Sequence, residues 1–235
     1  MLEASQGIVV LTGAGISAES GLPTFRGAGG LWEGQRVEDV ATPAAFARDP
    51  DLVQRFYNAR RAELRDPAIV PNPAHLALAE LERGWPGEFL LVTQNVDDLH
   101  ERAGSRRLIH LHGELRRALC RGCGGSMPWD SDLGCQDRCP ACAAVGRLRP
   151  DIVWFGEMPY RMDEVYAALE HCRIFVTIGT SGLVYPAAGF VQAAAGAERT
   201  IELNLDPSAM SLAFTERRLG RASDLVPTLV AELVS

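Results

Sequence analysis

Short, continuous apolar runs recur along the chain and predict buried β-strands. The first run, residues 7–12, is rich in β-branched side chains and leads directly into a glycine-containing turn. Similar runs cover residues 89–93, 108–111, 174–178 and 200–203. Apolar residues at consecutive positions are typical of strands that are covered on both faces, as in the centre of a parallel sheet.

Helical patterns lie between or after these runs, at residues 43–65, 74–83, 163–171, 186–195 and 224–234. A short helical stretch, residues 16–20, is also expected directly after the first turn. Because strands alternate with helices, the predicted fold class is α/β, with a doubly wound parallel sheet of the Rossmann type.

Two regions interrupt this alternation and are interpreted as insertions. Residues 27–73 carry a helical pattern without a convincing strand, whereas residues 116–149 are rich in Gly, Cys and Pro. The second region has too little apolar periodicity to fold alone and needs a stabilising cross-link or metal. We therefore predict one domain over residues 1–235, in which a large part (1–26, 74–115 and 150–235) carries both modules.

The cysteine spacing identifies the second insertion as a zinc module. Four of the six cysteines form two C-x-x-C pairs that are fifteen residues apart, namely Cys120, Cys123, Cys139 and Cys142. Four thiolates complete the tetrahedral shell of one structural Zn²⁺ and leave no open position for water. Four free thiols are the alternative. We expect Cys135 to be spare, although it is close enough in sequence to replace a ligand, and Cys172 to be a core residue.

Charge and hydropathy exclude several classes of protein. The net charge of −7 argues against binding of nucleic acid, which normally requires a basic face. No apolar stretch approaches the roughly 20 residues of a membrane span, and no basic segment precedes an apolar one at the N-terminus. Paired cysteines are typical of metal sites in a reducing compartment, so we expect a cytoplasmic protein without a membrane partner.

The turn after the first strand is a candidate phosphate-binding loop. Residues 13–18 fit the pattern G-x-G-x-x-G/A between a strand and a helix, where backbone amides can hold a pyrophosphate. A dehydrogenase would carry an acidic residue about twenty positions later, at the end of a second strand. Glu33 and Glu38 fall in a helical region instead. The loop therefore favours a nucleotide site of a different kind.

Polar clusters follow three further predicted strands, at residues 93–97, 179–181 and 204–206. One such cluster is more often a helix cap, but the carboxyl ends of parallel strands meet at one edge, where together they form a ligand crevice. His112 ends another strand and can face the same crevice. Histidine is well suited to proton transfer near neutral pH, although a lone strand histidine is often structural.

Taken together and in this order, the motifs resemble those of the sirtuin family. They are Gly13 to Gly21, Pro23-Thr24-Phe25-Arg26, Thr93 to Asp97, His112-Gly113, the paired cysteines, Val153 to Glu157, Gly179 to Ser181 and Asn204 to Asp206. The resemblance covers nearly the whole chain. It implies that NAD lies between a Rossmann-type domain and the two modules, and that acyl-lysine protein substrates enter from the opposite side.

The resemblance also implies an activity, which is removal of acyl groups from protein lysines. NAD is consumed, and nicotinamide, O-acyl-ADP-ribose and free lysine are formed. His112 would be the general base, and Asn95 and Asp97 would also be catalytic. Val153 and Phe155 would line the acyl-lysine channel. The implied NAD-binding residues are Gly13, Ala14, Gly15, Glu19, Thr24, Phe25, Arg26, Trp32, Gln94, Asn95, Val96, Asp97, Gly179, Thr180, Ser181, Asn204, Leu205, Asp206 and Ala222.

Two departures from the commonest family pattern bear on the substrate. Thr24 stands where many members carry Asp. Tyr57 and Arg60 have the Y-x-x-R spacing of the branch that contains the CobB-like bacterial deacylases and the mitochondrial desuccinylase. On a helix the two side chains share a face and can bind one carboxylate, so succinyl and malonyl groups are expected substrates beside acetyl.

Three other readings remain open at this stage. They are a deacetylase without preference for acidic acyl groups, a protein ADP-ribosyltransferase, and a catalytically idle NAD-sensing or interaction module. The presence of His112 together with Tyr57 and Arg60 favours deacylation. We expect the protein to be a monomer.

Overall fold

The computed structural model describes residues 7–24, 31–32 and 35–234, with the backbone alone at 31–32. Its centre is a six-stranded sheet in the order β11-β10-β9-β1-β4-β5, in which every neighbouring pair is parallel. The strands are β1 (Gly7–Thr12), β4 (Phe89–Thr93), β5 (Leu108–His110), β9 (Cys172–Ile178), β10 (Arg199–Asn204) and β11 (Glu216–Leu219). The α/β class with a parallel, Rossmann-type sheet is confirmed.

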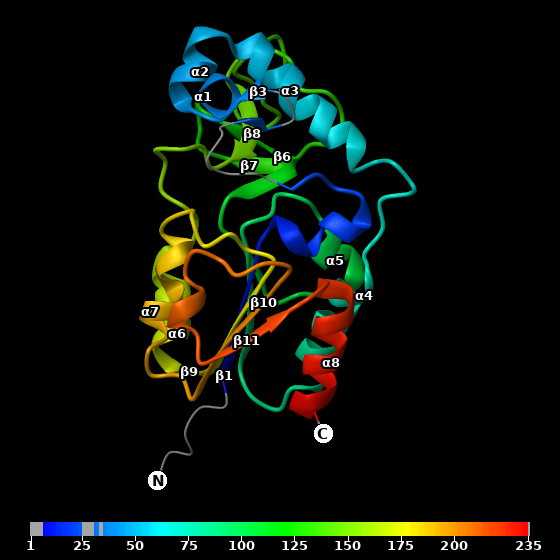
Figure 1. Cartoon of the computed structure of the whole chain (residues 1–235). Helices are drawn as coiled ribbons and strands as arrows, with labels where there is room; N and C mark the ends of the chain where they lie inside the picture. Colours follow the sequence, from blue (N-terminus) through cyan, green and yellow to red (C-terminus); the bar gives the residue numbers. More distant parts are fainter. Residues whose placement is uncertain (1–6, 25–30, 33–34, 235) are drawn as a thin grey trace.

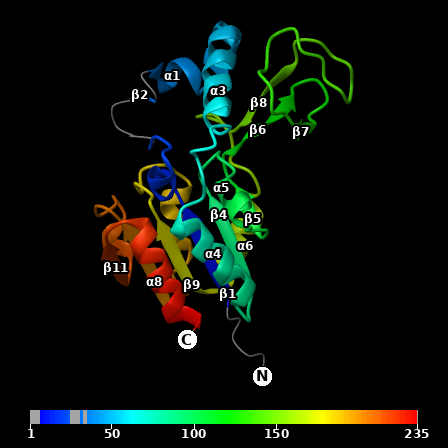
Figure 2. The same ribbon diagram turned by 90° about the vertical axis from the view of Figure 1, so that its right-hand side faces the viewer.

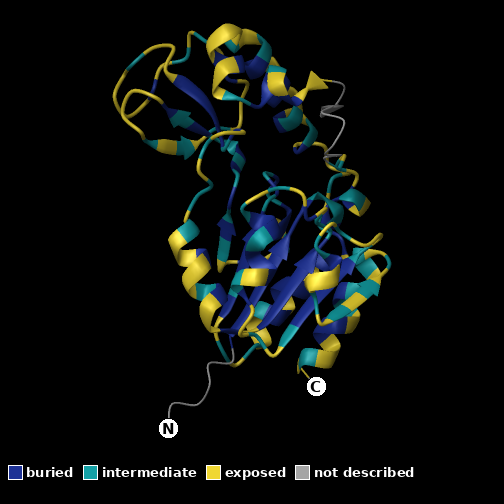
Figure 3. Cartoon of the chain, turned by 60° about the vertical axis from the view of Figure 1, so that its left-hand side comes forward, coloured by how far each residue is buried: buried dark blue, intermediate teal, exposed yellow. Residues whose placement is uncertain are grey.

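Both faces of this sheet are covered, as consecutive apolar positions predict. In β1, Ile8 and Val10 pack in the cluster with α4 (Pro73–Gly84) and α8 (Ala222–Val234). Val9 and Leu11 pack on the opposite face with α6 (Met162–His171) and α7 (Phe190–Ala193). Figure 1 shows the two helix pairs on either side of the sheet, and Figure 3 shows that the strands between them are buried.

A second lobe lies beyond the carboxyl ends of the strands and consists of two parts (Figure 2). One part is helical, with α1 (Val37–Val40), α2 (Pro43–Arg48) and α3 (Pro50–Glu63), next to the two-residue strands β2 (Leu31–Trp32) and β3 (Gln35–Arg36). The other part is an antiparallel sheet of β6 (Gly113–Cys120), β7 (Ser126–Pro128) and β8 (Leu148–Ile152). The two parts share one apolar cluster, in which Leu115 and Ile152 pack against α3.

The structure corrects several predicted elements. The helix expected over 43–65 is two helices, because Asp49 is non-helical directly before Pro50 and caps α3 through a hydrogen bond from Leu52 N at 2.9 Å. Residues 16–20 do not form an α-helix; two 3₁₀ turns, Ala14–Ile16 and Ala18–Ser20, end at Gly21. The helix expected over 186–195 is a 3₁₀ turn, Ala187–Gly189, followed by the short α7.

The strands β2, β3, β6, β7, β8 and β11 and the short helix α5 (Leu99–Ala103) were not predicted. Since β6 and β8 pair from Gly113 to Ile152, their ladder extends beyond the limits of 116 and 149 that the sequence suggested for the zinc module. Among the described residues, no helix is both long and apolar enough to cross a membrane.

Candidate active site

A cavity of about 680 Å³ lies between the carboxyl edge of the parallel sheet and the second lobe. Its size is typical of cavities that hold a cofactor or a small ligand. It brings together most of the predicted site residues, from segments that are far apart in the sequence: Gly13, Ala14, Gly15, Thr24, Tyr57, Arg60, Gln94, Asn95, Val96, Asp97, His112, Val153, Phe155, Gly179, Thr180, Ser181, Asn204, Leu205 and Asp206.

The remaining predicted NAD-binding residues are not in this lining. Glu19 accepts hydrogen bonds from Ser223 N at 3.2 Å and from Ser223 Oγ at 2.6 Å, so it holds the start of α8. Ala222 is the first residue of the same helix. Phe25, Arg26 and the side chain of Trp32 lie outside the described residues.

The glycine loop is shaped by close backbone packing against the loop that follows β9. Gly15 N donates to Gly179 O at 2.9 Å, and a Cβ atom on Gly15 would lie 2.6 Å from Gly179 Cα. Gly179 has a φ of 62°, and a Cβ atom on Gly179 would come equally close to the backbone of Gly15. Any side chain at either position would separate the two loops. The floor of the cavity therefore depends on glycine at both positions.

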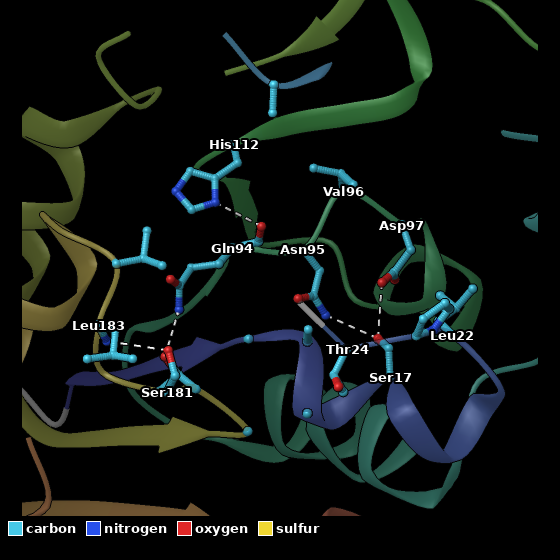
Figure 4. Close-up of a pocket in the computed structure, with 18 of the residues that line it drawn as sticks. Ser17, Leu22, Thr24, Gln94, Asn95, Val96, Asp97, His112, Ser181 and Leu183 are labelled. Atoms are coloured by element: carbon cyan, nitrogen blue, oxygen red, sulfur yellow. Dashed lines mark hydrogen bonds between the residues drawn. The ribbon is translucent and has the colours of Figure 1, made fainter. Parts of the chain in front are cut away.

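Asn95, Ser17 and Asp97 form a hydrogen-bonded chain at one end of the cavity (Figure 4). Asn95 Nδ2 donates to Ser17 Oγ at 3.1 Å, and Ser17 Oγ donates to Asp97 Oδ2 at 3.0 Å. Leu99 N donates to the other carboxylate oxygen at 3.1 Å. Burial raises the pKa of Asp97 to about 6, against the opposing effect of these donors.

His75 extends this chain below the cavity. Its Nδ1 accepts from Asn72 N at 3.4 Å, so the proton of the neutral ring is on Nε2, which lies 3.4 Å from Ser17 Oγ. Burial lowers the pKa of His75 to about 4, so the ring is neutral at pH 7. Ser17 and His75 were not among the predicted site residues. The sequence could have identified Ser17 as a site residue, because Ser17 belongs to the glycine-loop motif.

His112 lies in the turn between β5 and β6 and lines the cavity (Figure 4). Its Nδ1 is 3.0 Å from the carbonyl oxygen of Gln94. Because a carbonyl can only accept, Nδ1 carries the proton and Nε2 has a lone pair. Burial lowers the pKa of His112, although the Gln94 carbonyl opposes this effect. The ring is therefore in the state that a general base requires.

The opposite end of the cavity is tied together by Thr180. Gln94 Nε2 donates to Thr180 Oγ1 at 3.1 Å, and Asn204 Nδ2 donates to Thr180 O at 2.8 Å. Leu183 N lies 3.4 Å from Ser181 Oγ (Figure 4). These bonds connect the loops after β4, β9 and β10. The polar clusters expected at the strand ends thus lie together in the structure.

Tyr57 and Arg60 line the cavity from α3. The Tyr57 hydroxyl accepts a hydrogen bond from Trp154 Nε1 at 3.0 Å and is fully buried, and its burial raises its pKa. The hydroxyl is therefore protonated at neutral pH and can donate a hydrogen bond. The Arg60 guanidinium lies 4.6 Å above the Phe56 ring, and its Nε is 3.5 Å from Glu63 Oε2.

Trp154 is held in turn by a charged pair. The guanidinium of Arg149 lies 4.0 Å above the Trp154 ring and binds both carboxylate oxygens of Glu157, at 2.8 and 2.9 Å. Trp154 and Glu63 were not predicted as part of the site. Trp154 lies between the two predicted channel residues, whereas nothing in the local sequence marked Glu63.

The four paired cysteines meet at one point of the second lobe, with their sulfur atoms all within 4.8 Å of one another. Cys120 Sγ lies 3.7 Å from Cys142 Sγ, and Cys123 Sγ lies 3.9 Å from Cys139 Sγ. A tetrahedral zinc with bonds of about 2.3 Å separates its sulfur ligands by about 3.8 Å. The cluster therefore fits one zinc ion. Cys135 is not part of it.

The sixth cysteine, Cys172, is buried at the start of β9 and packs in the core beside α6. Its thiol donates to the carbonyl oxygen of Leu169 at 3.3 Å. Burial raises the pKa of this thiol to about 11, which is the opposite of what a nucleophile needs.

Comparisons with known proteins agree with these features. The model of the Sir2 family matches residues 13–186. A protein of Bdellovibrio bacteriovorus named NAD-dependent protein deacylase is 58% identical over 97% of this chain and 96% of its own length. A protein of the same name from Escherichia coli is 56% identical over 97% of this chain and 82% of its own length.

The solved structures include a crystal structure of a Sir2 homologue in complex with NAD. Its sequence is 41% identical and the TM-score is 0.86. The superposition covers 97% of this chain and 90% of the chain of the homologue. The family model matches well over half of the chain, and the relatives are similar over nearly all of it. The chain therefore belongs to the Sir2 family.

Proposed function

We propose that this protein is an NAD-dependent protein-lysine deacylase that forms nicotinamide, O-acyl-ADP-ribose and free lysine. The observation that carries the proposal is the position of His112, which lines the cavity together with Gln94, Asn95 and Asp97 and whose Nε2 is unprotonated. The deacylase names of the similar bacterial proteins support the same activity.

Asn95 and Asp97 would bind the nicotinamide end of NAD. An ionised carboxylate accepts hydrogen bonds, and the carboxamide of nicotinamide offers two N–H groups. The Ser17 and Leu99 donors hold the Asp97 carboxylate in place. Above pH 6 most Asp97 side chains are ionised, because their pKa is about 6. The backbone of the loop around Gly15 would face the phosphates.

When bound, NAD supplies an electrophilic ribose carbon and nicotinamide as the leaving group. The chemistry that NAD would supply is loss of nicotinamide with the electron pair of the glycosidic C–N bond and its replacement by the acyl oxygen of the substrate. One water molecule would then be consumed to release the free lysine, and no hydride would move. His112 Nε2 then accepts a proton from a ribose hydroxyl, which makes that oxygen a better nucleophile. The Nδ1–H bond to the Gln94 carbonyl keeps the ring oriented during the transfer.

The substrate side of the cavity would recognise the acyl-lysine. Val153 and Phe155 line it from the segment after β8 and would contact the lysine chain. Tyr57 and Arg60 would bind the terminal carboxylate of a succinyl or malonyl group by charge-assisted hydrogen bonds. Zinc in the four-cysteine cluster would stabilise the β6–β8 lobe and take no part in the chemistry.

We also propose a cytoplasmic monomer without a nucleic-acid partner. The net charge of −7 disfavours binding to phosphate backbones. Paired cysteines of the zinc-binding kind suit a reducing compartment.

The activity is tested by NAD-dependent release of nicotinamide from peptides that carry acetyl-lysine or succinyl-lysine. Deacylation predicts that nicotinamide, free lysine and O-acyl-ADP-ribose form in equal amounts. Transfer of labelled ADP-ribose to a protein would instead identify an ADP-ribosyltransferase. An absence of nicotinamide release with either peptide would refute the proposal.

A further inference from the structure

Glu63 places a negative charge in the part of the cavity that Tyr57 and Arg60 line. It is the last residue of α3, lines the same cavity, and pairs with Arg60 at 3.5 Å, one helical turn away. The side chain of Arg60 is 14% exposed and that of Glu63 is 41% exposed. The pair therefore lies at the wall of the cavity, with the carboxylate on its more open side.

The helix gives no electrostatic support to a carboxylate at this position. The C-terminal end of a helix carries partial negative charge and favours cations, so an acidic side chain is disfavoured there. Between the described residues, the ion pair that Glu63 makes is the one with Arg60. Its charge is thus balanced by the guanidinium that would bind an acidic acyl group.

We propose that Glu63 competes with the acyl carboxylate for Arg60 and so limits the preference of this enzyme for acidic acyl groups. The inference rests on the proposed deacylase function and names a residue that sets its substrate range. Glu63 Oε2 makes an ion-pair contact with Nε of the guanidinium at 3.5 Å, and one terminal nitrogen lies 3.4 Å from Phe56 O. A carboxylate that enters must approach a guanidinium that is already in part engaged.

The competition acts on charge and therefore distinguishes between acyl groups. A succinyl or malonyl carboxylate that reaches Arg60 comes close to the Glu63 carboxylate, and the two like charges repel. An acetyl group carries no charge and leaves the pair between Arg60 and Glu63 in place. Glu63 therefore lowers the turnover of acidic acyl groups relative to acetyl.

The test is the Glu63→Gln variant, which keeps the size of the side chain and removes its charge. We measure kcat/KM for succinyl-lysine and acetyl-lysine in one peptide sequence and compare the ratio of the two values. We expect the succinyl-to-acetyl ratio to rise about two- to fivefold, mainly through KM, which is the range for a partly exposed ion pair. A general loss of activity in the variant would lower both kcat/KM values and would therefore cancel in their ratio.

Two further variants serve as controls. Glu63→Asp keeps the charge and should keep the ratio closer to that of the wild type than Glu63→Gln does. Glu80→Gln removes an equal charge from an exposed position on α4 and should leave the ratio unchanged. A ratio that stays constant or falls in Glu63→Gln would overturn the proposal, and a fall would mean that Glu63 positions Arg60 for binding.

Equilibrium binding of fluorescent succinyl and acetyl peptides separates this inference from the proposed function. If the wild type turns over neither peptide, the deacylase proposal fails, but the binding ratio still reports on Glu63. If turnover is normal and both ratios are the same in Glu63→Gln and the wild type, only the inference about Glu63 fails.

Discussion

Replacing Arg60 by methionine tests the acyl pocket most directly. Methionine keeps an unbranched apolar chain that can still pack over the Phe56 ring, where the guanidinium lies at 4.6 Å. It removes the charge and every N–H donor. An acetyl group has no carboxylate to bind, whereas a succinyl group loses its cationic partner. We therefore expect desuccinylation to fall far more than deacetylation.

The size of the effect follows from the position of Arg60. Its side chain is 14% exposed, so a hydrogen bond to a charged group is only weakly screened by water. Bonds of this kind contribute about 1.5–3 kcal/mol. The variant also leaves the Glu63 carboxylate without its cation, and this carboxylate then repels the substrate. A loss of about 2–3 kcal/mol corresponds to a decrease on the order of a hundredfold in kcat/KM for succinyl-lysine.

The assay measures nicotinamide release with matched succinyl and acetyl peptides over a range of concentrations. Arg55→Met is the matched control, because Arg55 lies on the same helix with an exposed side chain. It should leave the ratio of the two kcat/KM values unchanged. Equal losses on the two peptides in Arg60→Met would refute the role of Arg60 in recognising the acyl carboxylate.

Three further predictions concern the base, the metal and the buried acid. His112→Asn should lower turnover on the order of 10²–10⁴-fold with little change in melting temperature, and a smaller loss in single-turnover assays would exclude a general base. Cys120→Ser should lose about one zinc per chain and lower the melting temperature, whereas Cys135→Ser should keep the zinc; the opposite result would assign Cys135 as a ligand. Asp97 has a folded pKa of about 6, raised by burial from 3.8, so its ionisation costs folding free energy as the pH rises from about 4 to about 6. Asp97→Asn should therefore raise the free energy of unfolding by about 1–3 kcal/mol at about pH 8 but by much less at about pH 4. The same variant should lower turnover. Equal shifts of the urea-unfolding free energy at both pH values would contradict the burial of an ionised carboxylate.

The central sheet was predictable because a strand that is buried on both faces has apolar residues at consecutive positions in the sequence. In β1 every residue from Gly7 to Thr12 is buried, and the sequence is apolar at consecutive positions. The polar clusters at strand ends were predictable for a related reason, since parallel strands carry their following loops to one edge. Asn95, Ser181 and Asn204 reach the same cavity although they lie at or after the ends of three different strands.

The strands of the second lobe have a weaker hydrophobic pattern in the sequence. β6 carries Arg116 and Arg117 among its half-buried positions, and its partner β8 follows nearly thirty residues later. Cross-strand pairs of this kind depend on tertiary contacts and produce no local period. The break between α2 and α3 did leave a local signal, because Pro50 disfavours a helical conformation at Asp49. The helical pattern on either side of Pro50 concealed it.

Partners of buried polar groups could not be predicted from the sequence at all. Ser17 lies 58 residues from His75 and 80 residues from Asp97. The three meet because α4 and the segment after β4 both lie against the glycine loop. The tautomer of His112 is equally a tertiary property, since it depends on the direction of the Gln94 carbonyl. The residue types indicated proton transfer and hydrogen bonding, whereas their protonation states came from the structure.

Two carboxylates in the cavity lie where folding alone disfavours a negative charge. Asp97 is buried enough for its pKa to rise to about 6, and Glu63 ends a helix at its negative pole. Each has a polar partner that holds it, Ser17 for Asp97 and Arg60 for Glu63, and each partner faces the same cavity. Asp97 costs stability, and such a group persists where ligand binding requires it. On this reasoning Asp97→Asn should stabilise the fold and impair the reaction with every acyl group, whereas Glu63→Gln should change the choice among acyl groups.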